Sequence, residues 1–221
     1  MVAAAPAQAV PATSAAAGRK AVRKPPSPWP PRLALLAALL PAGWLGLRFA
    51  TGRLGADPVA EALNSLGLYA ISFLLASLAC TPLQRVLGWS WTLRVRKTLG
   101  LAAFFWALGH LTFYAAVDQG LALGDIWADV VKRKFITLGM GTFLLLLPLA
   151  ITSTKRMEKK LGFRNWKRLH RVVYLAGALA CVHYFLRFKL PEAWPIAAGV
   201  LLLLLLGLRL RWPGWRASRT S

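Results

Sequence analysis

Acidic residues and cysteines are both scarce in this chain. Seven Asp and Glu stand against 28 Lys and Arg among 221 residues, which gives a formal net charge of +21. The two cysteines, Cys80 and Cys181, lie inside apolar runs, a placement that disfavours a disulfide or a zinc site and is typical of small packing residues. No nucleic-acid-binding motif accompanies the basic residues, so their excess favours membrane topology and contact with anionic lipid.

Long apolar runs make up most of the chain instead. Hydrophobic residues account for 57% of it, and they gather in blocks of about 15 to 20, the length needed to cross a bilayer. We therefore predict an all-α fold, an integral membrane six-helix bundle within residues 33–210. The predicted spanning segments are 33–50, 63–81, 98–117, 135–152, 169–188 and 194–208.

The distribution of Lys and Arg predicts the orientation. Twenty of the 28 lie before the first segment, in alternate loops or after the last segment, so both termini are expected in the cytoplasm. Residues 1–32, rich in Ala and Pro, are expected to form a disordered basic tail rather than a signal peptide, because no apolar run begins before Leu33. Residues 211–221 are expected to form a second basic tail. No loop exceeds about 17 residues, which leaves no room for a soluble catalytic domain.

All three histidines lie in or at the ends of apolar segments. His110 lies about 12 residues into segment 98–117 and His183 about 14 residues into segment 169–188, at depths of roughly 18 and 21 Å. Both segments run in the same direction, so the two imidazoles can meet at one level and supply both axial ligands of a haem iron. A hydrogen bond to a neighbouring helix would explain a single histidine, and a proton relay is the other functional alternative, although the segments contain no Asp or Glu.

His170 lies at the start of the fifth segment. It precedes His183 by 13 residues, about 20 Å along a helix axis, a separation that suits a second, inner haem. On an ideal helix, however, the two side chains are roughly 140° apart. The matching level near segment 98–117 holds Arg96 and Lys97 rather than a histidine. His170 is therefore either an inner haem ligand or an interfacial residue of the basic stretch "WKRLHR" that pairs with a lipid phosphate or a haem propionate.

Four stretches together resemble one family of bacterial membrane proteins. They are "LACTPLQ" (78–84), "VRKTLGLAAFFWALGHLTFY" (95–114), "RKFITLGMGTFLLLLPLAITS" (133–153) and "FRNWKRLHRVVYLAGALACVHY" (163–184). In their order they resemble the haem-binding membrane subunits of the periplasmic protein-methionine-sulfoxide reductase system, the MsrQ (YedZ) family. The paired histidines alone would also fit the wider ferric-reductase-like transmembrane superfamily.

The resemblance implies a b-type cytochrome in the bacterial inner membrane. Such a subunit passes electrons from the quinone pool, or from a reduced flavin, to a periplasmic molybdopterin enzyme that reduces methionine sulfoxide in damaged proteins. FMN is also associated with the family. His110 and His183 match the family's intramembrane histidines, and His170 matches the histidine that follows "WKRL".

The predicted function is therefore that of a non-catalytic electron-transfer subunit, with one or two haems and FMN as cofactors and a soluble reductase as partner. The outer loop 118–134 is a candidate docking surface for that partner. The alternative within the same class is a ferric or quinone reductase-like transmembrane cytochrome with another partner. A proton-coupled transporter is the alternative from a different class, and it would predict intramembrane carboxylates or an internal repeat.

Overall fold

The described residues of the chain, 28–188 and 192–210 in a computed structural model, are all helical or in short turns. The expected tail 211–221 and most of the expected tail 1–32 lie outside them. The first half contains α1 (Trp29–Ala50), α2 (Pro58–Leu87), α3 (Trp91–Phe113), the π-helical η1 (Tyr114–Asp118) and α4 (Leu123–Lys132). The second half contains α5 (Lys134–Ile151), α6 (Lys155–Leu161), α7 (Phe163–Leu169), the 3₁₀-helical η2 (His170–Val172), α8 (Val173–Leu186) and α9 (Ala193–Leu210).

Five of these helical stretches are long and apolar enough to cross a membrane. They are Trp29–Ala50, Pro58–Leu87, Trp91–Asp118, Lys134–Ile151 and Phe163–Leu186. The sixth predicted segment is also a helix, but its apolar part, Ala193–Arg209, is shorter. The all-α class is confirmed, with five candidate spans.

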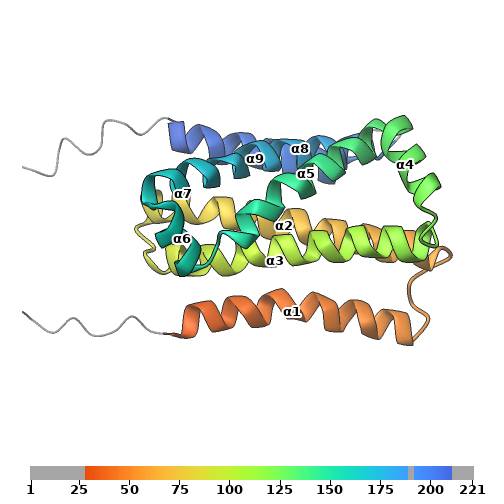
Figure 1. The fold of residues 1–221 in the computed structure, drawn as a ribbon. Helices are drawn as coiled ribbons and strands as arrows, with labels where there is room; N and C mark the ends of the chain where they lie inside the picture. The colour runs from red at the N-terminus through yellow and green to blue at the C-terminus, as the bar shows by residue number, and fades with distance from the viewer. Residues whose placement is uncertain (1–27, 189–191, 211–221) are drawn as a thin grey trace, which may run out of the picture.

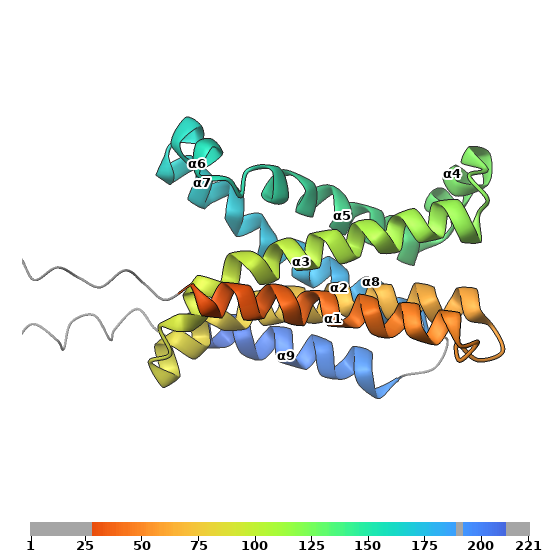
Figure 2. The same cartoon turned by 90° about the horizontal axis from the view of Figure 1, so that it is seen from below.

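Four helices form the centre of the bundle. α2 packs on α3 and α5 packs on α8, while contacts between α3 and α5 and between α2 and α8 join the two pairs. α1 covers α3 from one side, and α9 lies against α2 and α8 on the other (Figures 1 and 2). The start of α1, the end of α9 and the α6–α7 hairpin all lie at one end of the bundle, and α4 lies at the opposite end (Figure 1).

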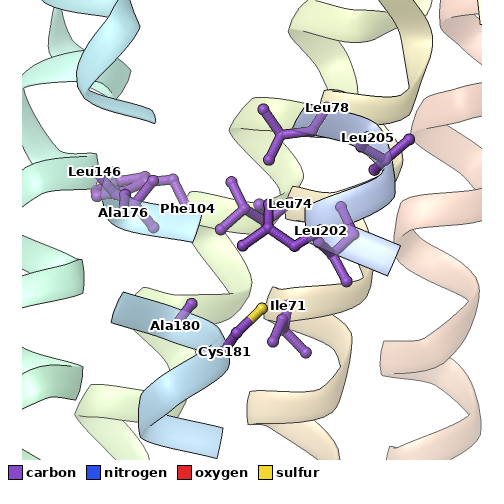
Figure 3. Packing of buried hydrophobic residues seen from close by; sticks show 12 residues of the cluster. Ile71, Leu74, Leu78, Phe104, Leu146, Ala176, Ala180, Cys181, Leu202 and Leu205 are labelled. Carbon is purple, nitrogen blue, oxygen red and sulfur yellow. The ribbon is translucent and has the colours of Figure 1, made fainter. Parts of the chain in front are cut away.

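The interior is small and apolar. Figure 3 shows Leu202 and Leu205 of α9 beside Leu74 and Leu78 of α2, within one cluster that extends to α3, α5 and α8. Many large apolar side chains face outward instead; Leu40, for example, is 72% exposed. In water such a surface would promote aggregation, whereas in a bilayer it can contact the lipid chains.

A proline and an arginine from different helices complement each other at the edge of this core. Pro82 lies inside α2 and has no N–H to donate to the carbonyl of Leu78, four residues earlier. Arg209 of α9 donates to that carbonyl from Nη2 at 2.6 Å, and its Nη1 donates to the hydroxyl of Tyr174. The guanidinium thus replaces the hydrogen bond that the proline removes.

Two expected loops contain helices that hydropathy did not predict. Residues 118–134 include α4, and residues 153–168 include α6 and most of α7. Both regions alternate polar and apolar residues with helical spacing, so a search for uniformly apolar runs passes over them. The helix predicted to begin at 169 continues back to Phe163, with η2 inside it.

Candidate functional site

A cavity of about 250 Å³ lies between α2, α3, α5 and α8. His110 of α3 and His183 of α8 both line it, so the structure brings together the two histidines that the sequence placed at one depth. The other lining residues are mostly apolar, among them Ile71, Leu111 and Phe143. An apolar cavity with a few convergent polar groups is the usual form of a cofactor site.

The two imidazole rings lie near each other, at a distance that suits a shared metal. Their ring centres are 6.2 Å apart, and the ring planes are inclined by 81°. A metal–imidazole nitrogen bond is about 2 Å long and the ring centre lies roughly 1.2 Å beyond the nitrogen, so two trans imidazoles have ring centres about 6 Å apart. His110 and His183 are therefore separated as two axial ligands of one iron would be.

Backbone carbonyls determine the tautomer of both rings. Nδ1 of His110 lies 3.0 Å from the carbonyl oxygen of Leu63, and Nδ1 of His183 lies 2.6 Å from that of Phe135. A carbonyl only accepts, so each Nδ1 carries the proton and donates it. In the neutral imidazole the lone pair is then on Nε2, which is the form that a metal-binding histidine requires.

A glycine one helical turn beyond each carbonyl makes room for the ring. A Cβ atom on Gly67 would lie 3.2 Å from Cε1 and Nδ1 of His110, and one on Gly139 would lie 2.8 Å from Cε1 of His183. Each glycine comes four residues after the carbonyl that accepts from the same ring, in "LNSLG" (63–67) and "FITLG" (135–139).

These four residues were not identified from the sequence as parts of the site. Gly67 and Gly139 were not predicted to contact the histidines, and neither Leu63 nor Phe135 was recognised as a hydrogen-bond acceptor. The signal that could have found them is the pattern shared by the two pentapeptides, an apolar residue, two further residues and then Leu-Gly. Its meaning depends on which helices are neighbours, and that appears only in the folded bundle.

Charged and polar groups gather at one end of the cavity. Arg133, Arg187, Tyr114 and Asp118 line it there. Arg133 is paired with Asp129, with Nε 3.0 Å from Oδ1, and Oδ2 of the same carboxylate accepts a hydrogen bond from Tyr114 at 3.0 Å. Two guanidinium groups at the edge of an apolar cavity can pair with carboxylates of a bound molecule.

His170 lies apart from the cavity, in η2. Its ring stacks on Trp166 with centres 4.0 Å apart, and Trp166 donates from Nε1 to the carbonyl of Thr152 at 2.9 Å. Nδ1 of His170 lies 3.2 Å from the carbonyl oxygen of Trp166, so Nδ1 is again the donor and Nε2 is buried without a hydrogen-bond partner. Three 3₁₀ residues at about 120° each reduce the angle to His183 from roughly 140° to roughly 80°.

These features fit an iron porphyrin. In the described part of the chain, no three His, Cys, Asp or Glu converge as they would around a metal ion held by side chains alone. A porphyrin supplies four of the six iron ligands itself, so two imidazoles suffice. The flat apolar ring suits the apolar lining, and its carboxylate side chains suit Arg133 and Arg187.

Comparison with known proteins identifies the family of the chain. The family described as "Ferric reductase like transmembrane component" matches residues 63–181, a stretch that includes His110 and His170 and ends two residues before His183. The chain is thus a ferric-reductase-like transmembrane protein.

Close relatives narrow the class. The protein-methionine-sulfoxide reductase heme-binding subunit MsrQ of Rhodospirillum rubrum is 47% identical over 175 residues, covering 79% of this chain and 84% of the relative. MsrQ of Deinococcus radiodurans is 46% identical over 192 residues, 86% of this chain and 94% of the relative. MsrQ of Brucella ovis is 42% identical over 209 residues, 94% of each chain. The chain belongs to the MsrQ family and is a multi-pass membrane protein.

Proposed function

We propose that the chain is the b-type cytochrome subunit of a methionine-sulfoxide reductase system, with His110 and His183 as the axial ligands of one haem b. The observation that carries the proposal is the 6.2 Å separation of two rings whose Nδ1 atoms both donate to backbone carbonyls. The MsrQ relatives are named for haem binding, which supports the same cofactor here.

The role proposed for the subunit is to carry electrons from the quinone pool, or from reduced flavin, to a periplasmic molybdopterin reductase that repairs oxidised methionine. A bound haem supplies a one-electron carrier within the membrane. The chain itself contributes ligand geometry: the carbonyls of Leu63 and Phe135 hold the two rings in one tautomer, and the apolar lining excludes water. Arg133 and Arg187 offset negative charge at the cavity edge.

The membrane arrangement proposed is six crossings with both termini in the cytoplasm. Two observations support it: the start of α1 and the end of α9 lie at one end of the bundle, and most Lys and Arg gather in the loops and tails assigned to that end. α9 would be the sixth crossing.

The partner is proposed to dock at the end that carries α4, which would face the periplasm. Leu123, Trp127 and Val131 follow one another at intervals of four residues along α4 and are 77%, 70% and 64% exposed. α4 packs mainly on α5, and this row of side chains is left uncovered.

A second, inner haem at His170 belongs to the proposal as well. Its support is the buried Nε2 without a hydrogen-bond partner and the reduced helical angle produced by η2. We also propose FMN as a further cofactor, and we assign no residue to its binding.

Absorbance spectra of the purified protein, before and after reduction with dithionite, test the haem assignment. We expect a reduced b-type α band in wild type that weakens in His110→Ala and in His183→Ala, because each of these variants should keep only the inner haem. His170→Ala is the matched variant: it should keep the outer site and lower the haem-to-protein ratio from two to one. A colourless wild type after haem supplementation would overturn the cytochrome assignment and return the histidines to helix packing or proton transfer.

A further inference from the structure

A row of four cations runs along the helix that begins at Phe163. Arg164, Lys167, Arg168 and Arg171 line one surface hollow together with Phe163. All four are exposed, and within the described part of the chain none has a carboxylate within 4 Å. Nζ of Lys167 lies 5.9 Å from the centre of the Phe163 ring, a contact that leaves the positive charge unneutralised. Four such charges in one hollow make an anion site.

The folding of α7 and η2 determines the direction in which the cations point. With 100° per residue, the four side chains fall within about 100° of one another on the helix. Their centre is about 130° away from the face formed by Trp166 and His170. The stack between these two rings lies within the helix, and the hydrogen bond from Trp166 to Thr152 joins this opposite face to the end of α5. The cations are therefore held away from the core.

The position of the row along the helix indicates which kind of anion the site binds. Residues 172–186 carry no Asp, Glu, Lys or Arg, and Arg171 comes directly before them. The row from Arg164 to Arg171 spans about 10 Å, beginning where the uncharged stretch ends. Lipid headgroups occupy roughly 5 to 7 Å on each side of the hydrocarbon core. The row is thus long enough to span the headgroup layer, with Arg171 at its hydrocarbon edge.

We propose that Arg164, Lys167, Arg168 and Arg171 form a binding site for the phosphate of an anionic phospholipid. The length of the row exceeds that of one free phosphate ion, and its place at the edge of an apolar helix favours a headgroup over a soluble ester. Arginine matches phosphate oxygens in a two-pronged geometry, which makes this stronger than a general attraction.

Native mass spectrometry of the delipidated full-length protein tests the site, with phosphatidylglycerol as the probe and phosphatidylcholine as the neutral comparison. The test variant replaces all four cations with Gln. The control variant, Lys155→Gln, Arg156→Gln, Lys159→Gln and Lys160→Gln, removes the same charge from α6. We expect the test variant to bind phosphatidylglycerol at least tenfold more weakly than wild type, and the control to stay within twofold. The combined variant Arg164→Lys, Arg168→Lys and Arg171→Lys keeps the charge but lacks the two-pronged geometry, so it should bind more weakly than wild type and more tightly than the test variant.

Three outcomes would overturn the proposal. Equal losses of phosphatidylglycerol binding in the test and control variants would show that binding depends only on net charge. Equal binding of phosphatidylcholine and phosphatidylglycerol by wild type would show that the negative charge of the lipid is not recognised. Displacement of the lipid by inorganic phosphate or FMN at equal concentration would make the site one for a soluble phosphate. None of these readouts depends on haem.

Discussion

Gly139 of α5 lies so close to His183 of α8 that a single added methyl group would collide with the imidazole. A Cβ atom built on this glycine would lie 2.8 Å from Cε1 and 2.9 Å from Nδ1 of the ring. The ring cannot move away freely, because its Nδ1 donates to the carbonyl of Phe135 on the same helix as the glycine. His183 can therefore adopt this orientation only because residue 139 has no side chain.

Gly139→Ala should therefore reduce haem retention far more than it disturbs the fold. We expect the haem-to-protein ratio to fall at least severalfold and the reduced α band to broaden, because the ring must rotate or α5 and α8 must separate. The haem content of the purified protein and its reduced spectrum measure both effects. Gly67→Ala should act in the same direction but more weakly, since its Cβ would lie 3.2 Å from the His110 ring.

Gly141→Ala is the matched control for this pair. It lies on the same helix, two residues further on, and an added Cβ would meet Leu179 at 3.8 Å, an ordinary contact. Alanine is also the better helix former. Equal haem loss in Gly139→Ala and Gly141→Ala would show that α5 tolerates no added volume anywhere, and the specific contact with His183 would lose its importance.

The sequence predicted which histidines would meet because depth along a helix is a local property. Counting residues from the basic end and multiplying by the rise per residue placed His110 and His183 at nearly one level, and the structure brings their rings together. Their role as iron ligands stays a prediction. The same counting could not show which helices are neighbours, so Leu63 and Gly67 on α2 were not recognised as the surroundings of His110.

Local departures from regular helix were the second limit. An ideal helix puts His170 and His183 roughly 140° apart, and only the folded chain reveals η2, which changes that angle. α4 was not predicted for a related reason. Hydropathy detects uniformly apolar runs, whereas Asp125 and Asp129 interrupt the apolar run of this amphipathic helix.

Arg209→Met should destabilise the bundle by about 1.5–3 kcal/mol, the range for hydrogen bonds that involve a charged group. The substitution removes the donors to Leu78 and Tyr174 that join α9 to α2 and α8. Thermal unfolding in detergent measures the loss. In a Pro82→Ala background the same substitution should cost less, because alanine has the backbone N–H that proline lacks and can donate it to the Leu78 carbonyl. Equal losses in the two backgrounds would contradict the link between Arg209 and Pro82.

Cys80 and Cys181 should remain thiols under air. Both are free and buried, at 2% and 7% exposure, on α2 and α8. Maleimide labelling of the native protein should be slow at both positions and complete only after denaturation, with no change in gel mobility on reduction. Fast native labelling of either cysteine would show that the helix packing around it opens readily.

Tyr114→Phe should loosen α4 without unfolding the bundle. The tyrosine hydroxyl donates to Asp129, which also pairs with Arg133, so one carboxylate connects η1, α4 and the edge of the cavity. Losing a hydrogen bond to a charged acceptor costs about 1.5–3 kcal/mol, which corresponds to amide exchange faster by roughly ten- to 150-fold wherever opening is local. Hydrogen exchange across residues 123–132 measures this. Tyr184→Phe is the control, since Tyr184 lines the same cavity and its hydroxyl makes no hydrogen bond within the described residues. If α4 exchanged at the wild-type rate in Tyr114→Phe, the carboxylate of Asp129 would be held by Arg133 alone, and η1 would have no part in positioning the outer end of the cavity.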